Sequence, residues 1–275
     1  MINIVPIAGR HAIKTVSFGL EWQDPLQEDL LTFLMALHAK VRDKLPRVTR
    51  HEEIPLKVVL SQAQPEQEAP VKPQLASVTF DALQRNGEQE WSLVIQRNFL
   101  AVNCYVYTRW NEIWGIGREL LTPFLPVIAR ERGISVIGLQ YVDQFRVTGS
   151  REHFRASHLL REGSRFVPTQ AFQLDDLWHS HHGFFEKLTE PTTHRRLNHV
   201  NVDVADTNDE RVIQITTAHR ALLDRPAEDE SRLLNSGGEG ELHHYMDQLH
   251  KVNKQFLCEL LNEDMCNQIG LKEEQ

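Results

Sequence analysis

Cysteines and long apolar runs are both scarce in this sequence of 275 residues. The three cysteines, Cys104, Cys258 and Cys266, have no paired spacing, which argues against a disulfide framework and fits a reducing cytoplasm. No apolar run is long enough to cross a membrane, and the N-terminal residues lack the apolar core of a signal peptide. We therefore expect a cytoplasmic protein that does not associate with membranes.

Basic charge is scarce as well. Lys and Arg number 30 against 38 Asp and Glu, which gives a formal net charge of −8. General nucleic-acid binding needs a basic surface, so the charge disfavours nucleic acid as a partner and favours a basic protein surface. With 41% hydrophobic and 25% charged residues the composition is ordinary for a globular protein, and the chain can bury one large core or two modest ones.

Catalytic motifs are missing too. The sequence contains no G-x-S-x-G and no Walker pattern, and Gly115 and Gly117 fall inside a predicted helix instead of a dinucleotide loop. No serine or cysteine lies in a recognisable nucleophile motif. The sequence therefore favours a protein that is not an enzyme and that needs no cofactor.

The clearest periodicity lies between Trp91 and Val147. It predicts a β-hairpin, 91–96 and 99–107, turning at Arg97-Asn98. A helix follows, with a break at Thr122-Pro123 and an end at Gly133, and then a long strand over 137–147. Because both faces of 99–107 are largely apolar, we expect this strand to be covered on both sides.

The rest of the chain predicts further strands, two further long helices and two polar loops. The strands are expected at 14–22, 54–60, 75–83, 177–188, 195–205 and 211–220, the helices at 26–44 and 242–262, a short helix at 150–160, and the loops at 61–72 and 224–241. The fold class is α+β, with antiparallel sheets packed on long helices. One arrangement is two pseudo-repeated, helix-grip-like units, 1–133 and 134–275; the other is one continuous sheet with helices on one face.

Three segments carry a resemblance to a known family. They are VIQRNFLAVNCYVYTRW, IGLQYVDQF and LHKVNKQFLCELL, and the distinctive polar and aromatic residues in them are Asn103, Arg109, Trp110, Tyr141 and Asp143. Together they resemble a sporadically distributed bacterial protein family of about this length. That family has no established activity, so the resemblance implies no catalytic residues. Its patchy occurrence implies mobile accessory genes of the toxin–antitoxin or phage-defence kind.

These five residues are candidate binding residues. A basic cluster with interleaved aromatic side chains, Phe154 and Phe166, adds further candidates that could contact phosphate: Arg151, Arg155, Arg161 and Arg165. A second basic cluster comprises Arg42, Lys44, Arg47 and Arg50. For both clusters a solvated surface is the simpler interpretation.

Histidine spacing suggests two weak metal sites. His179 and His181 point the same way on a predicted strand, and His199 and Asp203 share a face of the probable neighbouring strand. An exposed polar strand face explains the same pattern without a metal. On the last predicted helix the flank formed by His243, Asp247 and His250 fits a solvated helix face better than a metal site. We therefore expect no bound metal.

Three functions remain open. The first is a non-enzymatic protein-interaction component of a bacterial accessory system, with a partner encoded nearby or with self-association through the last helix. The second is a small-ligand or nucleotide-sensing module with a pocket between sheet and helix. The third is a metal-dependent hydrolase centred on His179 and His181.

Overall fold

The computed structural model describes residues 2–54, 72–149, 153–207, 210–234 and 240–271. Its centre is one ten-stranded sheet in which every pairing is antiparallel, so the predicted α+β class with extensive antiparallel pairing is confirmed. The strands are β1 (Asn3–Pro6), β2 (Ile13–Glu21), β3 (Arg47–Glu53), β4 (Gln74–Leu83), β5 (Gln89–Gln96), β6 (Phe99–Cys104), β7 (Ile134–Thr148), β8 (Trp178–Leu188), β9 (His194–Thr207) and β10 (Glu210–Ala227).

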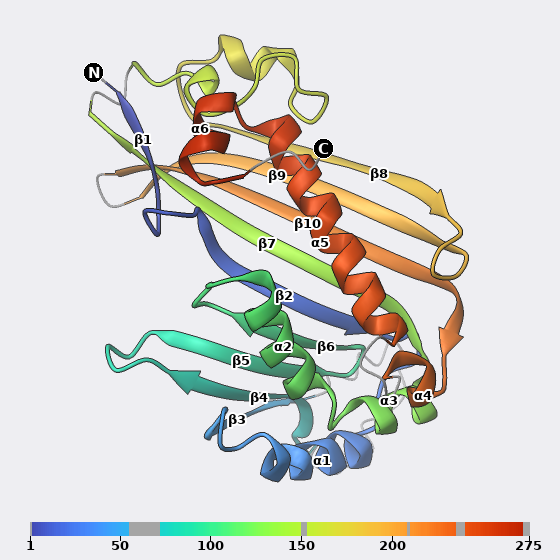
Figure 1. Ribbon diagram of the computed structural model, residues 1–275. Coiled ribbons are helices and arrows are strands. Elements are labelled where there is room, and N and C mark those ends of the chain that lie inside the picture. Colours follow the sequence, from blue (N-terminus) through green and yellow to red (C-terminus); the bar gives the residue numbers. More distant parts are fainter. Residues whose placement is uncertain (1, 55–71, 150–152, 208–209, 235–239, 272–275) are drawn as a thin grey trace, which may run out of the picture.

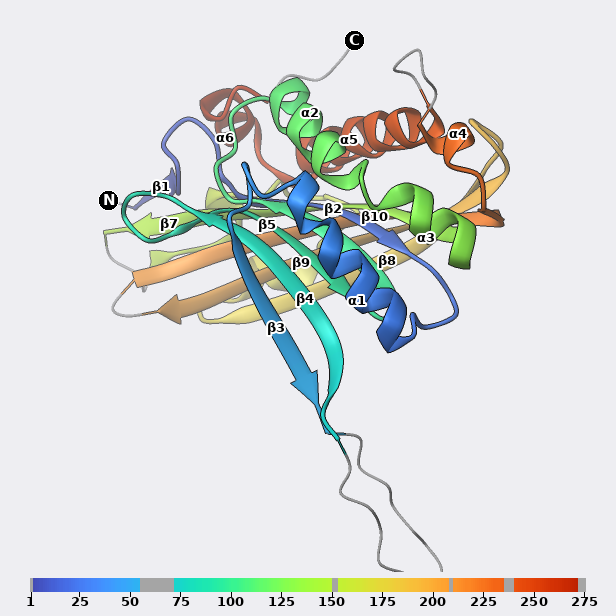
Figure 2. The ribbon, with the colours of Figure 1, turned by 90° about the horizontal axis from the view of Figure 1, so that it is seen from below.

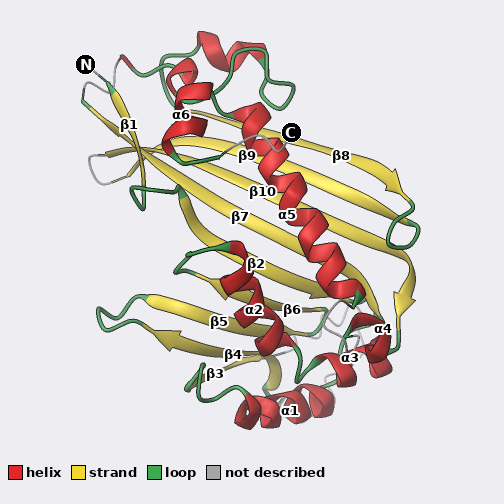
Figure 3. Ribbon diagram, in the orientation of Figure 1, coloured by secondary structure: helices red, strands yellow, loops and turns green. Residues whose placement is uncertain are grey.

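The strand order is β3-β4-β5-β6-β2-β7-β10-β9-β8, and β1 pairs with the end of β7 beyond β2 (Figure 1). The helices are α1 (Glu28–Ala36), α2 (Trp110–Leu121), α3 (Leu125–Arg132), α4 (Glu230–Leu233), α5 (Glu241–Leu260) and α6 (Glu263–Gln268). Figure 3 shows α5 running diagonally across the strands. None of the helices in the described part of the chain has the length and apolar composition to cross a bilayer.

The helices that contact the sheet lie on one of its two faces. In Figure 2, α2 and α5 lie above the strands, whereas β3 and β4 extend below, away from them. No described helix covers the opposite face, which we call the open face. The expectation that the strand 99–107 is covered on both sides is therefore wrong. Its apolar signal came from Phe99 and Ala101, which are only partly buried on the open face.

Two hydrophobic clusters fill the space between the sheet and the helices. The first joins β2, β4–β7, the C-terminal end of β10, α1–α4 and the N-terminal half of α5, and the second joins β7, β9, β10 and the C-terminal half of α5. Four apolar residues of the central stretch are buried together in the first cluster: Leu100, Val102, Trp114 and Leu139. Because both clusters bury residues of α5, that helix connects the two parts of the core.

Most predicted elements of the central stretch are confirmed. The Arg97-Asn98 turn joins β5 to β6, and the helix breaks near Thr122 and ends at Gly133, whose φ of 67° favours glycine. Thr122 ends α2 instead of starting the next helix. The strands predicted over 177–188 and 195–205 are β8 and β9, and the helix predicted over 242–262 is α5.

Other predictions are wrong in their bounds. Helix α1 is nine residues long and continues only as a 3-10 turn, Leu37–Lys40, and its Phe33 is 52% exposed. Strand β3 was missed because all its residues are exposed, which leaves no apolar alternation. The strand predicted at 54–60 and the loop at 61–72 lie almost entirely outside the described residues. The helix expected from Ser150 is, where described, a 3-10 turn, Ala156–His158.

The acidic segment 224–241 is not one long loop. Its first residues end β10, four more form α4, and Glu241 begins α5. Ala227 and Leu233 are buried in the first hydrophobic cluster, and Arg232 forms an ion pair with Glu241 at 2.7 Å. The burial of these two apolar residues and the ion pair stabilise the described parts of this segment, which its acidic composition did not indicate.

Candidate functional site

The contact between α2 and α5 is built from aromatic and polar side chains. The Nε1 of Trp110 donates to Asp247 Oδ1 at 3.1 Å, and the Nε1 of Trp114 donates to His243 Nδ1 at 2.7 Å. Lys251 lies 3.2 Å from the other oxygen of Asp247. Partial burial acts to raise the pKa of Asp247, but the bonds from Lys251 and Trp110 hold it below its ordinary value.

His250 continues this contact toward the sheet. Its ring stacks on Trp110 with 4.1 Å between ring centroids, and its Nδ1 lies 2.8 Å from the hydroxyl of Tyr141 on β7. Tyr141 is fully enclosed, and burial raises its pKa well above its ordinary value. The predicted residues Trp110 and Tyr141 are thus brought together, through a histidine that was expected to face solvent. The solvated-face interpretation of His243, Asp247 and His250 is wrong, because α2 packs on that flank.

Asp143 lies two residues beyond Tyr141 on the same face of β7 and is 2% exposed. Burial raises its pKa to about 7. Its Oδ2 accepts no hydrogen bond from the part of the chain that the structure describes. The ionisable groups that interact with it are Tyr107 and Tyr141. Asp143 is therefore a buried acid that changes charge near neutral pH.

A second polar chain crosses β10 and β9 under the C-terminal half of α5. The buried His219 has its Nδ1 2.8 Å from Asn198 Oδ1, and Asn198 donates to Glu186 at 2.6 Å. Arg196 forms an ion pair with Glu186 at 2.7 Å. Burial lowers the pKa of His219 to about 3, so its ring is neutral at physiological pH.

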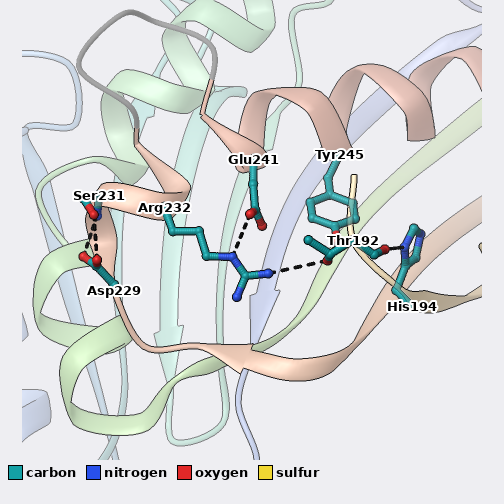
Figure 4. A network of polar contacts seen from close by, with 7 residues as sticks. All are labelled: Thr192, His194, Asp229, Ser231, Arg232, Glu241 and Tyr245. Atoms are coloured by element: carbon teal, nitrogen blue, oxygen red, sulfur yellow. Dashed lines mark hydrogen bonds and ion pairs between the residues drawn. The ribbon is translucent and has the colours of Figure 1, made fainter. Parts of the chain in front are cut away.

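A third network anchors the N-terminal end of α5 (Figure 4). Arg232 donates to Glu241, and Thr192 Oγ1 lies 2.8 Å from the hydroxyl of the buried Tyr245. The backbone carbonyl of Thr192 lies 2.7 Å from His194 Nδ1. These contacts tie the β8–β9 connection to α4 and α5. No local pattern predicts the contact between Thr192 and Tyr245, because these residues lie 53 positions apart in the chain.

The remaining polar residues of the resembled segments are Asn103 and Arg109. Asn103 is on the open face, where it donates to Ser92 Oγ at 3.0 Å across β5 and β6. Arg109 is exposed and precedes the first residue of α2. The five candidate residues of the resembled segments therefore do not form one site.

The open face carries a row of small and polar residues, one from each of nine strands. Each member is the register partner of the next, and we call this set the polar row: Arg47, Asp81, Ser92, Asn103, Ser17, Gln140, Ala218, His199 and Gly183. Toward β4 the row is enclosed, with Ser92 1% exposed. Toward β8 it is open, since Gln140, His199 and Gly183 are exposed.

Two of the four predicted phosphate-binding arginines, Arg155 and Arg165, lie beside carboxylates. Arg165 donates to both oxygens of Glu259, at 2.8 and 3.1 Å, and Arg155 lies 4.0 Å from Asp175. Arg161 donates to the Leu261 carbonyl at 3.4 Å. Arg151 lies outside the described residues. The second basic cluster is paired in the same way: Arg42 with Asp43, Lys44 with Glu119, Arg47 with Asp81, and Arg50 with Glu52.

His179 and His181 are exposed on β8 with their ring centroids 5.5 Å apart. The adjacent strand is β9, as predicted, and it places Asp203 opposite His179 and Asn201 opposite His181. His199 lies opposite Gly183, and its ring occupies the space that a Cβ there would need. Within the described residues no three His, Cys, Asp or Glu side chains are arranged to hold a metal ion.

Two cavities of about 880 and 940 Å³ lie away from the interface between α5 and the sheet. The first is beside the end of α5 and α6 and includes Arg161, Cys258 and Cys266 in its lining. The second is at the end of the sheet and includes His11 and Tyr107. Between α5 and the sheet, Leu249, Val252 and Phe256 are at most 7% exposed and fill the space expected for a ligand.

Comparison of the chain with protein-family models and with curated proteins found no match.

Proposed function

We propose that this protein is a non-enzymatic component of a bacterial accessory system, of the toxin–antitoxin or phage-defence type, that binds a basic protein partner on the open face. The observation that carries this proposal is the open face itself, which no described helix covers and which bears the polar row. The exposed part of this face, from Gln140 to Gly183, offers hydrogen-bonding groups and little steric obstruction to a docking protein. The accessory-system context rests on the resemblance of the three sequence segments.

The arrangement of charge supports a basic partner. In both basic clusters most of the described side chains have carboxylates within 4.0 Å, which reduces the positive field that nucleic acid would need. The net charge of −8 leaves an acidic excess. Part of it is exposed at the end of β10, at Asp224, Glu228 and Glu230. Complementary charge of this kind raises the association rate of two proteins.

The polar clusters on the helix face support a role without catalysis. The side chains of Trp110, Trp114 and Tyr141 have hydrogen-bonding partners within the protein. These contacts fix α2 and α5 on the sheet. Buried polar networks with satisfied partners commonly specify a single packing arrangement, so a structural role accounts for them.

Co-expression with the product of a neighbouring gene tests the proposal. We expect a complex of fixed stoichiometry by native mass spectrometry. We also expect reversal of Glu228 and Glu230 to lysine to slow association at low salt and to have little effect at high salt, because salt screens exposed charge. Asp229 is left unchanged, since its side chain caps α4. An isolated protein that turns over a nucleotide or ester, and loses that turnover on substitution of one cavity residue, would refute the proposal.

We also propose that the chain consists of two related units, 1–133 and 134–275. In each half a central strand, β2 or β7, is followed by a connection to an outer strand, β3 or β8. The chain then returns strand by strand to the centre and continues into a helix, α2 or α5. The two central strands pair with each other, with Gly19 opposite Gly138, which supports a two-fold relation between the halves.

A further inference from the structure

The two edges of the sheet differ in charge. Strand β3 at one edge carries four charged side chains in seven residues, and all seven residues are exposed. Charged side chains on an edge strand discourage pairing with another chain. Strand β8 at the other edge has no Asp, Glu, Lys or Arg between Trp178 and Phe185, and among the described strands it pairs only with β9 (Figure 1). The edge of β8 therefore lacks the protection that β3 has.

Exposed apolar residues are placed symmetrically about His181. Leu177 is 48% exposed and Phe185 is 56% exposed, and each lies four residues from His181. Because side chains alternate along a strand, Phe185 shares the open face with His179 and His181. Leu177, which directly precedes β8, is an even number of positions from them and is expected on the same face. If two β8 strands pair in antiparallel fashion with His181 opposite its own copy, Leu177 of each copy lies opposite Phe185 of the other. On the helix face the same register places Trp178 opposite Phe184.

The charges near this edge are compatible with that register. Asp175 of one copy would lie opposite Lys187 of the other. Asp176 would lie opposite Glu186, but these two carboxylates already have partners, Arg211 at 3.5 Å and Arg196 at 2.7 Å.

We propose that two copies of this chain associate through their β8 edges, with a two-fold axis at His181, so that the two ten-stranded sheets become continuous. A two-fold interface uses the same surface on both copies, which is why a self-complementary strand fits a second copy of this chain. Backbone hydrogen bonds supply the pairing, and the Leu177–Phe185 contacts fix the register. This interface lies at the sheet edge and leaves the centre of the open face accessible, so it is independent of the proposed partner.

Sedimentation velocity or light scattering on the full chain tests the interface. We expect a dimer that His181→Lys weakens roughly tenfold or more, because it places two like charges opposite each other. The matched control is Thr49→Lys at the middle of β3, which should leave the dimer intact. A monomeric wild-type protein, or equal effects of both lysines, would overturn the proposal.

A charge exchange tests the register. Leu177→Lys and Phe185→Glu should each weaken the dimer, since each loses the apolar contact. The double variant should restore association, because residue 177 of one copy lies opposite residue 185 of the other. Circular dichroism of each variant separates loss of association from loss of folding. Failure of the double variant to recover any association, with the fold intact, would contradict this register.

Discussion

At the residue scale, two buried groups give the protein opposing responses to pH. Asp143 has a pKa raised to about 7 by burial, and His219 has a pKa lowered to about 3 by burial. Between about pH 4 and 6.5 the folded protein keeps the Asp143 proton that the unfolded chain releases. Over the same interval the unfolded chain binds a proton at His219 that the folded protein does not. The two contributions to stability oppose each other there.

Substitution of Asp143 by asparagine should separate them. The wild-type carboxyl reduces stability as pH rises from about 4 to 7, and above pH 7 its cost is constant, on the order of 4 kcal/mol. Asp143→Asn should therefore be more stable than wild type at pH 8, and its stability should rise with pH between 4 and 6.5. Urea unfolding across this range measures both effects. The exposed Asp224→Asn is the control, and equal pH profiles for wild type and Asp143→Asn would contradict the account.

Substitution of His219 should have the opposite result. In His219→Gln there is no imidazole that gains a proton on unfolding at acid pH. Only Asp143 then makes stability depend on pH, so stability should fall as pH rises from 4 to 7. The amide can still contact Asn198, which keeps the cost of the substitution modest. The same unfolding series provides the measurement. A steeper loss of stability toward acid pH than in wild type would count against a neutral, buried His219.

Sequence reasoning at this scale identified residues but not their surroundings. The spacing of His243, Asp247 and His250 showed that they share a flank of a helix, but spacing does not reveal which element packs there. Trp110 and Tyr141 were singled out and do come together, whereas Asn103 lies on the other face of the sheet. Contacts between distant segments depend on the tertiary arrangement, which a local pattern does not encode.

At the element scale, the contact between α2 and α5 depends on tryptophan donors. Trp110→Phe keeps a ring on His250 but leaves Asp247 without one donor, so we expect a loss of about 1–2 kcal/mol in the free energy of unfolding. In an Asp247→Asn background the loss should be smaller, because the acceptor is no longer charged. A double-mutant cycle by urea unfolding measures the difference. Equal losses in both backgrounds would rule out a charge-assisted bond.

Elements with a strong local signal were predicted and the others were not. The hairpin of β5 and β6, the break after α2 and strand β7 follow from apolar alternation, a proline and a glycine. Strand β3 has no buried residue, and α1 ends early, so neither had a reliable apolar pattern. The acidic composition around α4 concealed two buried apolar residues, Ala227 and Leu233.

At the scale of the whole molecule, the first hydrophobic cluster contains residues of both halves. The first cluster contains Leu139 and Tyr141 of β7 and Leu242 and Met246 of α5 together with residues of the first half. The proposed units 1–133 and 134–275 should therefore not fold when expressed separately, and they should associate when co-expressed. Circular dichroism and gel filtration of each fragment check this. A stable, folded 1–133 fragment would mean that the halves are independent domains.

The architecture of the whole molecule was the least accessible from sequence. Strand order in an antiparallel sheet depends on pairings between distant segments, and the pattern left both two units and one continuous sheet open. The apolar residues of β6 suggested a covered strand. Ala101 of β6 and its neighbour Gly19 on β2 are, however, small enough to lie on an exposed sheet face. The open face, on which the proposed function depends, was therefore found only in the structure.

The most direct test of the proposed function is the affinity of the co-expressed partner for a variant of the open face. Gln140 is exposed at the centre of the polar row, and Gln255 is exposed on the outer side of α5. Gln140→Arg should weaken binding of a basic partner roughly tenfold or more, whereas Gln255→Arg, the same change of side chain, should leave it within about twofold. Equal affinities for the two variants would show that the partner does not dock on the open face.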